Sequence, residues 1–114
     1  MKSIDQLEFR GAIGNQPLRS FTMNQFVNAL KDNGWAELSY DARIHRAGKD
    51  NGPHFFSRLL ERGPGCGIYS LNGLARALRD GRTEPAKHGR FARVCCAGSL
   101  VVIVQPPNQL VTII

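Results

Sequence analysis

The sequence predicts an α+β domain with N-terminal helices packed on a C-terminal antiparallel β-meander. Three observations support this fold class. Apolar residues recur at helical spacing in the first two thirds of the chain, and after Pro85 the pattern changes to runs rich in valine and isoleucine. The connections between those runs are too short for anything but antiparallel neighbours. The 114 residues suit a single domain, 1–114, with one modest hydrophobic core.

Three helices are predicted before the change of pattern. The first has Thr22 and Gln25 as a capping box, repeats apolar residues as far as Leu30, and ends at Gly34. The second begins at Pro53, and the third begins after the N-cap Ser70 and ends at Gly81. Their predicted buried residues are Phe55, Phe56, Leu59 and Leu60 in the second helix and Leu71, Leu74, Ala75 and Leu78 in the third.

The last third predicts three strands, at 90–96, 99–104 and 110–114, with turns at Ala97-Gly98 and around Pro106-Pro107-Asn108. Residues 36–40 and 42–46 fit either short strands or irregular structure, and the pattern leaves both open.

The positive charge of the chain is concentrated in its middle. The net charge is +6, yet residues 1–42 hold four basic and five acidic residues, and residues 94–114 hold none of either kind. Residues 43–93 hold eleven basic and four acidic residues. Such a concentration is typical of a surface that binds a polyanion, with RNA the best candidate, although a solvated basic face without a partner would give the same pattern.

Several other classes of function find little support. No apolar run is long enough to span a membrane, and the first residues lack the apolar segment of a signal peptide. No phosphate-binding loop of the GxxxxGK[ST] type is present, and the scattered carboxylates predict no metal site and no cofactor. Cys95 and Cys96 are neighbours that would point to opposite faces of a strand, so they and Cys66 are predicted to be reduced thiols.

The remaining chemistry is RNA cleavage without a metal ion. It needs a base for the 2′-hydroxyl proton, an acid for the 5′-oxygen, and cations for the phosphate. Histidine can fill either proton-transfer role, and arginine matches phosphate oxygens. The only three histidines, His45, His54 and His88, all lie in the basic segment.

Each histidine has basic neighbours that can bind phosphate. The densest cluster is Lys87-His88-Gly89-Arg90, placed where a loop enters the first predicted strand, with Arg93 farther along that strand. A polar loop that happens to contain a histidine is the alternative. The other candidates are the His54–Arg58 pair one helical turn apart, the cluster Arg43, His45 and Arg46, the exposed Arg76 and Arg79 of the third helix, and the hydroxyl of Thr112. The alternative for the basic residues and histidines is that they form solvated polar surfaces without a ligand. The alternative for Thr112 is that it is an ordinary strand residue.

The order of elements predicted for residues 54–114 resembles that of a known group of bacterial toxin domains. A helix ending Arg79-Asp80-Gly81 leads to His88-Gly89-Arg90-Phe91 entering a strand, then to a valine-rich strand, a short turn and a closing strand at 110–114. This resembles the C-terminal toxin domains of bacterial contact-dependent growth inhibition and related polymorphic toxin systems. More broadly, it is similar to the superfamily of barnase, EndoU, the tRNA-cutting colicins and RelE.

The resemblance implies a metal-independent ribonuclease with helices packed on an antiparallel sheet. It implies catalytic roles for His88, Arg90 and Thr112, joined by His54 and Arg58 from a helix. It also implies cleavage of tRNA, a cognate immunity protein as partner, and secretion within a larger effector that acts in the target-cell cytoplasm. Two rival hypotheses are a non-catalytic RNA-binding module and the ribonuclease toxin of a chromosomal toxin–antitoxin pair, which would stay in its own cytoplasm.

Overall fold

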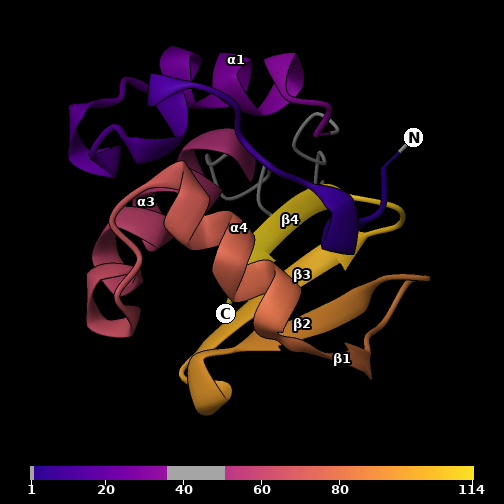
Figure 1. Cartoon of the computed structure of the whole chain (residues 1–114). Coiled ribbons are helices and arrows are strands. Elements are labelled where there is room, and N and C mark those ends of the chain that lie inside the picture. Colours follow the sequence, from indigo (N-terminus) through magenta and orange to yellow (C-terminus); the bar gives the residue numbers. More distant parts are fainter. Residues whose placement is uncertain (1, 36–50) are drawn as a thin grey trace.

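A computed structural model describes residues 2–35 and 51–114, with only the main chain described at 51–53, and it has the predicted α+β fold (Figure 1). Among these residues three α-helices precede four antiparallel strands that pair in the order β1-β2-β3-β4. The helices are α1 Met23–Asp32, α3 Asn51–Arg62 and α4 Leu71–Asp80. The strands are β1 Arg82–Pro85, β2 Phe91–Cys95, β3 Leu100–Gln105 and β4 Gln109–Ile113.

The predicted helix ends are confirmed for α1 and α4. The Thr22 hydroxyl accepts a hydrogen bond from the main-chain N–H of Gln25, whose side chain accepts one from the N–H of Thr22 in return. Ser70 caps α4 by accepting from the N–H of Gly73 at 3.1 Å. Helix α3 begins at Asn51, two residues earlier than predicted. Pro53 thus lies in the first turn, where its missing N–H breaks no helical hydrogen bond.

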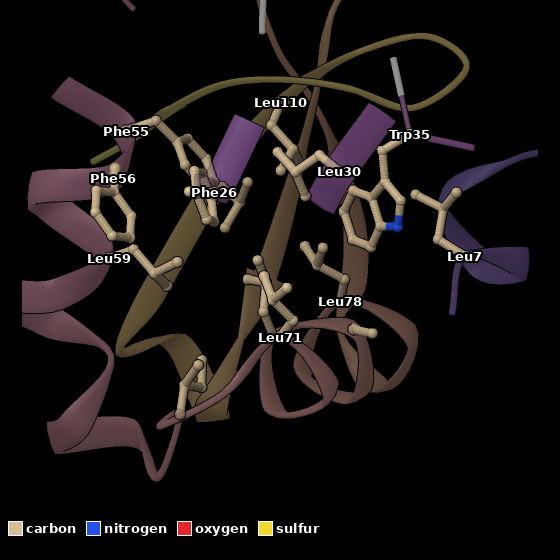
Figure 2. Close-up of a cluster of buried hydrophobic side chains, with 14 of the residues drawn as sticks. Leu7, Phe26, Leu30, Trp35, Phe55, Phe56, Leu59, Leu71, Leu78 and Leu110 are labelled. Carbon is tan, nitrogen blue, oxygen red and sulfur yellow. The ribbon is translucent and has the colours of Figure 1, made fainter. Parts of the chain in front are cut away.

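One hydrophobic core joins the helices to the sheet and to the N-terminal segment (Figure 2). The ring of Phe26 stacks on Phe55 and Phe56, with centroids 6.3 and 4.6 Å apart, which fastens α1 to α3. Trp35 stacks on Phe9 at 5.1 Å. All the residues predicted to be buried in α3 and α4 belong to this core, except that Leu60 only packs against its edge.

The sheet has one strand more than predicted. The three expected strands are present as β2, β3 and β4, and β1 adds to the edge beside β2. The sequence of β1, Arg-Thr-Glu-Pro, has little β propensity, and all four residues are exposed. Pairing with β2 holds this segment, and Pro85 at its end is tolerated because the segment is an edge strand.

The extra strand turns the predicted loop at Lys87–Arg90 into a hairpin turn. His88 and Gly89 have φ values of +63° and +71°, and the N–H of Arg90 donates to the carbonyl of Lys87 at 3.3 Å. Two consecutive positive φ angles match a type I′ turn, whose twist suits a two-residue hairpin. The loop does enter the first predicted strand, now β2, but it comes from β1, a strand that the sequence did not predict.

The sheet has an inner face, covered by the helices, and an outer face. Along β3, Leu100, Val102 and Val104 are fully buried and alternate with partly exposed residues. Helix α4 crosses in front of the strands in Figure 1 and covers the inner face. By this alternation Arg93 points inward.

Some expectations fall on other parts of the chain. The segments predicted as short strands or irregular structure, 36–40 and 42–46, lie outside the described residues. Within 2–35 and 51–114, no helix is long and apolar enough to cross a membrane.

Candidate functional site

The outer face of the sheet carries a polar group at its β1–β2 end. Register and alternation place Arg82 and Glu84 of β1 on this face, together with Arg90 and Gln105. The Nε of Arg90 donates to Oε1 of Gln105 at 3.2 Å, which joins the start of β2 to the end of β3. His88 lies exposed in the turn just before Arg90. We call Arg82, Glu84, His88, Arg90 and Gln105 the hairpin cluster.

A carboxylate stands between the two arginines of the hairpin cluster. Oε1 of Glu84 accepts from both Nε and Nη2 of Arg82, each at 3.1 Å. Glu84 pairs with Ala92, so Arg90, two residues before Ala92, is its diagonal neighbour at about 7–8 Å between Cα atoms. Both side chains of the ion pair are at least half exposed, so solvent and a ligand can reach them.

This arrangement offers the groups that phosphate chemistry needs. A carboxylate can accept the proton of a 2′-hydroxyl, and the guanidinium groups of Arg82 and Arg90 can bind phosphate oxygens on either side of it. His88 is exposed in the turn that connects β1 to β2, so it lies at the same end of the sheet as Glu84 and Arg90, and histidine can give or take a proton near neutral pH.

Sequence reasoning missed Arg82, Glu84 and Gln105. It overlooked β1, and without that strand nothing placed these side chains near Arg90. The available signal was the dipeptide His88-Gly89 flanked by short polar and apolar runs, because glycine at the second position is typical of a type I′ hairpin turn.

Thr112 lies on the outer face but away from the hairpin cluster. The register runs Glu84, Ala92, Ile103, Thr112 across four strands, and neighbouring strands are about 4.8 Å apart, so Glu84 and Thr112 are separated by about 14 Å. The Thr112 hydroxyl donates to the carbonyl of Ile113 at 3.5 Å. At that separation Thr112 and Glu84 cannot contact one and the same phosphate, so the structure does not bring Thr112 together with the hairpin cluster.

His54 and Arg58 lie at the other side of the sheet. They are one turn apart on α3, and both are partly buried. Helix α3 contacts β4, the strand at the edge opposite β1, and in Figure 1 it lies far from the β1–β2 turn. The structure therefore does not bring His54 together with His88, and the two cannot share one phosphate.

The side chain of Arg93 is buried and forms its hydrogen bonds within the protein. The guanidinium donates to the carbonyls of Leu78 and Arg79, to the Thr83 hydroxyl and to the Asp5 carboxylate. The two carbonyls belong to the last turn of α4, where helices leave acceptors unpaired. Arg93 thus caps α4, and because its side chain is buried and four of its five N–H donors are used within the protein, the structure gives no support to its predicted role in RNA binding.

The remaining predicted residues are divided among separate surfaces. Arg76 and Arg79 are exposed on α4, on the side of that helix turned away from the sheet, and Nη1 of Arg79 donates to the carbonyl of Leu7 at 3.2 Å. Lys87 is exposed in the hairpin turn next to the hairpin cluster. His45, with Arg43 and Arg46, lies outside the described residues. The basic segment thus supplies at least two surfaces on opposite sides of the sheet.

Comparisons with protein-family models, curated proteins and solved structures found no match for this chain. Within the described part of the chain, no three histidine, cysteine, aspartate or glutamate side chains gather closely enough to hold a metal ion.

Proposed function

We propose that this chain is a metal-independent ribonuclease that cleaves tRNA and acts as the toxin domain of an interbacterial growth-inhibition system. The observation that carries the proposal is the exposed carboxylate of Glu84, flanked by Arg82 and Arg90 on the outer face of the sheet. Cleavage by transfer to the 2′-hydroxyl needs a base beside phosphate-binding cations, and the hairpin cluster provides both.

Each member of the hairpin cluster has a role in the proposed reaction. Glu84 accepts the proton of the 2′-hydroxyl while that oxygen attacks the adjacent phosphorus. Arg82 and Arg90 bind the non-bridging oxygens, whose negative charge grows in the transition state. His88, in its protonated form, gives its proton to the departing 5′-oxygen. The products are a 2′,3′-cyclic phosphate and a free 5′-hydroxyl.

The biological setting is the less direct half of the proposal. It rests on the resemblance of residues 54–114 to contact-dependent toxin domains, with secretion in a larger effector, action in the target-cell cytoplasm, and a cognate immunity protein as partner. A free-standing toxin–antitoxin pair would use the same site within its own cytoplasm.

A non-catalytic RNA-binding module is the second candidate. The Glu84 carboxylate is already paired with Arg82, and a pair that stays closed when RNA binds would leave no base. The outer face would then bind RNA without cutting it.

The test is incubation of purified protein with total RNA and with tRNA, with and without EDTA. We expect cleavage in both conditions, with products ending in a 2′,3′-cyclic phosphate, and we expect Glu84→Gln to lower the rate by about 10²–10⁴. Glu61→Gln is the matched control, because Glu61 is an exposed carboxylate on α3. Loss of cleavage with EDTA, restored by magnesium, would overturn the mechanism. RNA binding without cleavage by the wild type would establish the binding module instead.

A further inference from the structure

Two cysteines 30 residues apart in the sequence meet where the turn after α3 approaches the β2–β3 turn. Cys66 ends the short 3₁₀ turn Pro64–Cys66, and Cys96 begins the turn Cys96–Gly98. The thiol of Cys96 is 3.8 Å from the main-chain carbonyl oxygen of Cys66, to which it donates a weak hydrogen bond. Both thiols are free and partly exposed.

The contact exists because Cys96 leaves the strand. Consecutive strand residues point to opposite faces, which would separate Cys96 from anything near Cys95. Cys96 instead has φ +54°, followed by Ala97 at +55°, so its side chain turns toward Cys66. Cys95 stays in β2 with its thiol buried and 1% of its surface exposed. The prediction of three reduced thiols did not distinguish Cys95 from the other two, which the structure separates by burial and by contact.

We propose that Cys66 and Cys96 are a redox-active pair that forms a reversible intramolecular disulfide with low-molecular-weight disulfides such as glutathione disulfide. Because the Cys96 sulfur already contacts the main chain of Cys66, side-chain rotations and main-chain shifts in the two turns can bring the sulfur atoms to bonding distance. The turns leave room for such shifts: a Cβ added to Gly65, Gly67 or Gly98 would meet no heavy atom within 4 Å among the described residues.

The reaction is ordinary thiol–disulfide exchange. One cysteine thiolate attacks a sulfur of glutathione disulfide, and the first glutathione leaves as a thiolate. The second cysteine thiolate then attacks the protein sulfur of this mixed disulfide and releases the second glutathione. The two cysteine protons end on the two glutathione thiols, so the protein is oxidised by two electrons and glutathione disulfide is reduced.

The Cys66–Cys96 disulfide would cross-link the two ends of the segment that contains most of the hairpin cluster. The closed loop from Cys66 to Cys96 contains α4, β1 and β2, and hence Glu84, His88 and Arg90. A cross-link over this length removes much conformational freedom from the unfolded chain. The oxidised protein would therefore be more resistant to unfolding than the reduced protein, and it would return to the reduced form wherever thiols are abundant.

The experiment is oxidation of the wild-type protein with glutathione disulfide, followed by alkylation, intact mass measurement and peptide mapping. We expect the loss of two hydrogen masses, a Cys66–Cys96 cross-linked peptide, alkylation of Cys95 only after unfolding, and full reversal by dithiothreitol. The melting temperature of the oxidised form should exceed that of the reduced form by roughly 10 °C. Burial and the nearby Cys66 side chain raise the pKa of Cys96, so formation should accelerate as the pH rises.

Three variants complete the test. Cys95→Ala should form the same disulfide, whereas Cys66→Ser and Cys96→Ser should give at most a mixed disulfide with glutathione. The proposal is overturned if the wild type forms a bond that includes Cys95, only intermolecular bonds, or none at all. Because mapping of the wild type decides the matter, the result does not depend on whether a variant folds or whether the protein cleaves RNA.

Discussion

The two faces of the sheet use arginine in opposite ways. Arg93 points to the inner face, is 7% exposed and gives its donors to main-chain carbonyls and a carboxylate of the protein itself. Arg90, three residues earlier, lies on the outer face beside Gln105. Both are basic residues of one short segment, yet only Arg90 is placed to meet a phosphate. Charge along the sequence therefore indicates a binding surface only after the face of each residue is known.

The sharpest test of the outer face is His88→Asn, for which we expect cleavage to fall by about 10²–10⁴ while stability is kept or rises slightly. Asparagine tolerates the positive φ of position 88 better than most residues, and with Gly89 it makes a favoured type I′ pair. The substitution therefore removes the imidazole without disturbing the turn. Cleavage of tRNA and urea unfolding, measured on the same preparation, provide the two readouts.

Other results for the histidines would relocate the site. If His88→Asn cleaves RNA as the wild type does and His54→Ala does not, the reacting phosphate lies beside α3 and not at the hairpin cluster. If both variants remain active, histidine is not the proton donor, and Lys87 becomes the best candidate for that role.

The inner face should respond to substitution through stability. Arg93→Met keeps much of the aliphatic side chain but leaves the carbonyls of Leu78 and Arg79 without their buried donor, and we expect a loss of about 3 kcal/mol in the free energy of unfolding. Arg90→Met is the matched control, expected to change stability by no more than about 0.5 kcal/mol. Equal losses in urea unfolding would show that the two faces do not differ in the way described.

Much of the fold could be predicted from the sequence because its signals are local. The capping box at Thr22, the N-cap Ser70 and the apolar spacing of α4 each lie within a few residues of the element they define. The apolar runs of β3 and β4 likewise predict strands from their own composition. Strand β1 has no such signal, because its pairing with β2 and not its own composition makes it a strand.

The candidate site was harder to predict because it depends on contacts between distant residues. Arg93 reaches Asp5, 88 residues away, and the buried Asn108 amide donates to the carbonyls of Lys2 and Gly34. No periodicity reveals such contacts, so Arg93 resembled a phosphate-binding residue. His88 and Arg90 were singled out by local charge, but their partner Glu84 became visible only through the register of β1 with β2.

RNA binding provides a smaller comparison between the two sides of the molecule. Arg90→Gln should weaken tRNA binding by about 1 kcal/mol and reduce the salt dependence of affinity by about one counterion. Arg76→Gln, on the exposed side of α4, is the matched loss of charge and should have less effect. Equal effects in titrations at several salt concentrations would mean that the RNA contacts both sides of the sheet.

The last comparison tests whether water is excluded from the inner face at the end of β2. Burial, assisted by the nearby Cys96, raises the pKa of Cys95 from 9.0 to about 11. Between these values the unfolded protein releases the thiol proton and the folded protein keeps it, so the free energy of unfolding should fall as the pH rises from 9 to about 11. Below pH 9 this group should contribute no pH dependence. Urea unfolding under reducing conditions should therefore decline less steeply over this range for Cys95→Ala than for the wild type, and parallel curves would mean that water reaches the Cys95 thiol in the folded protein.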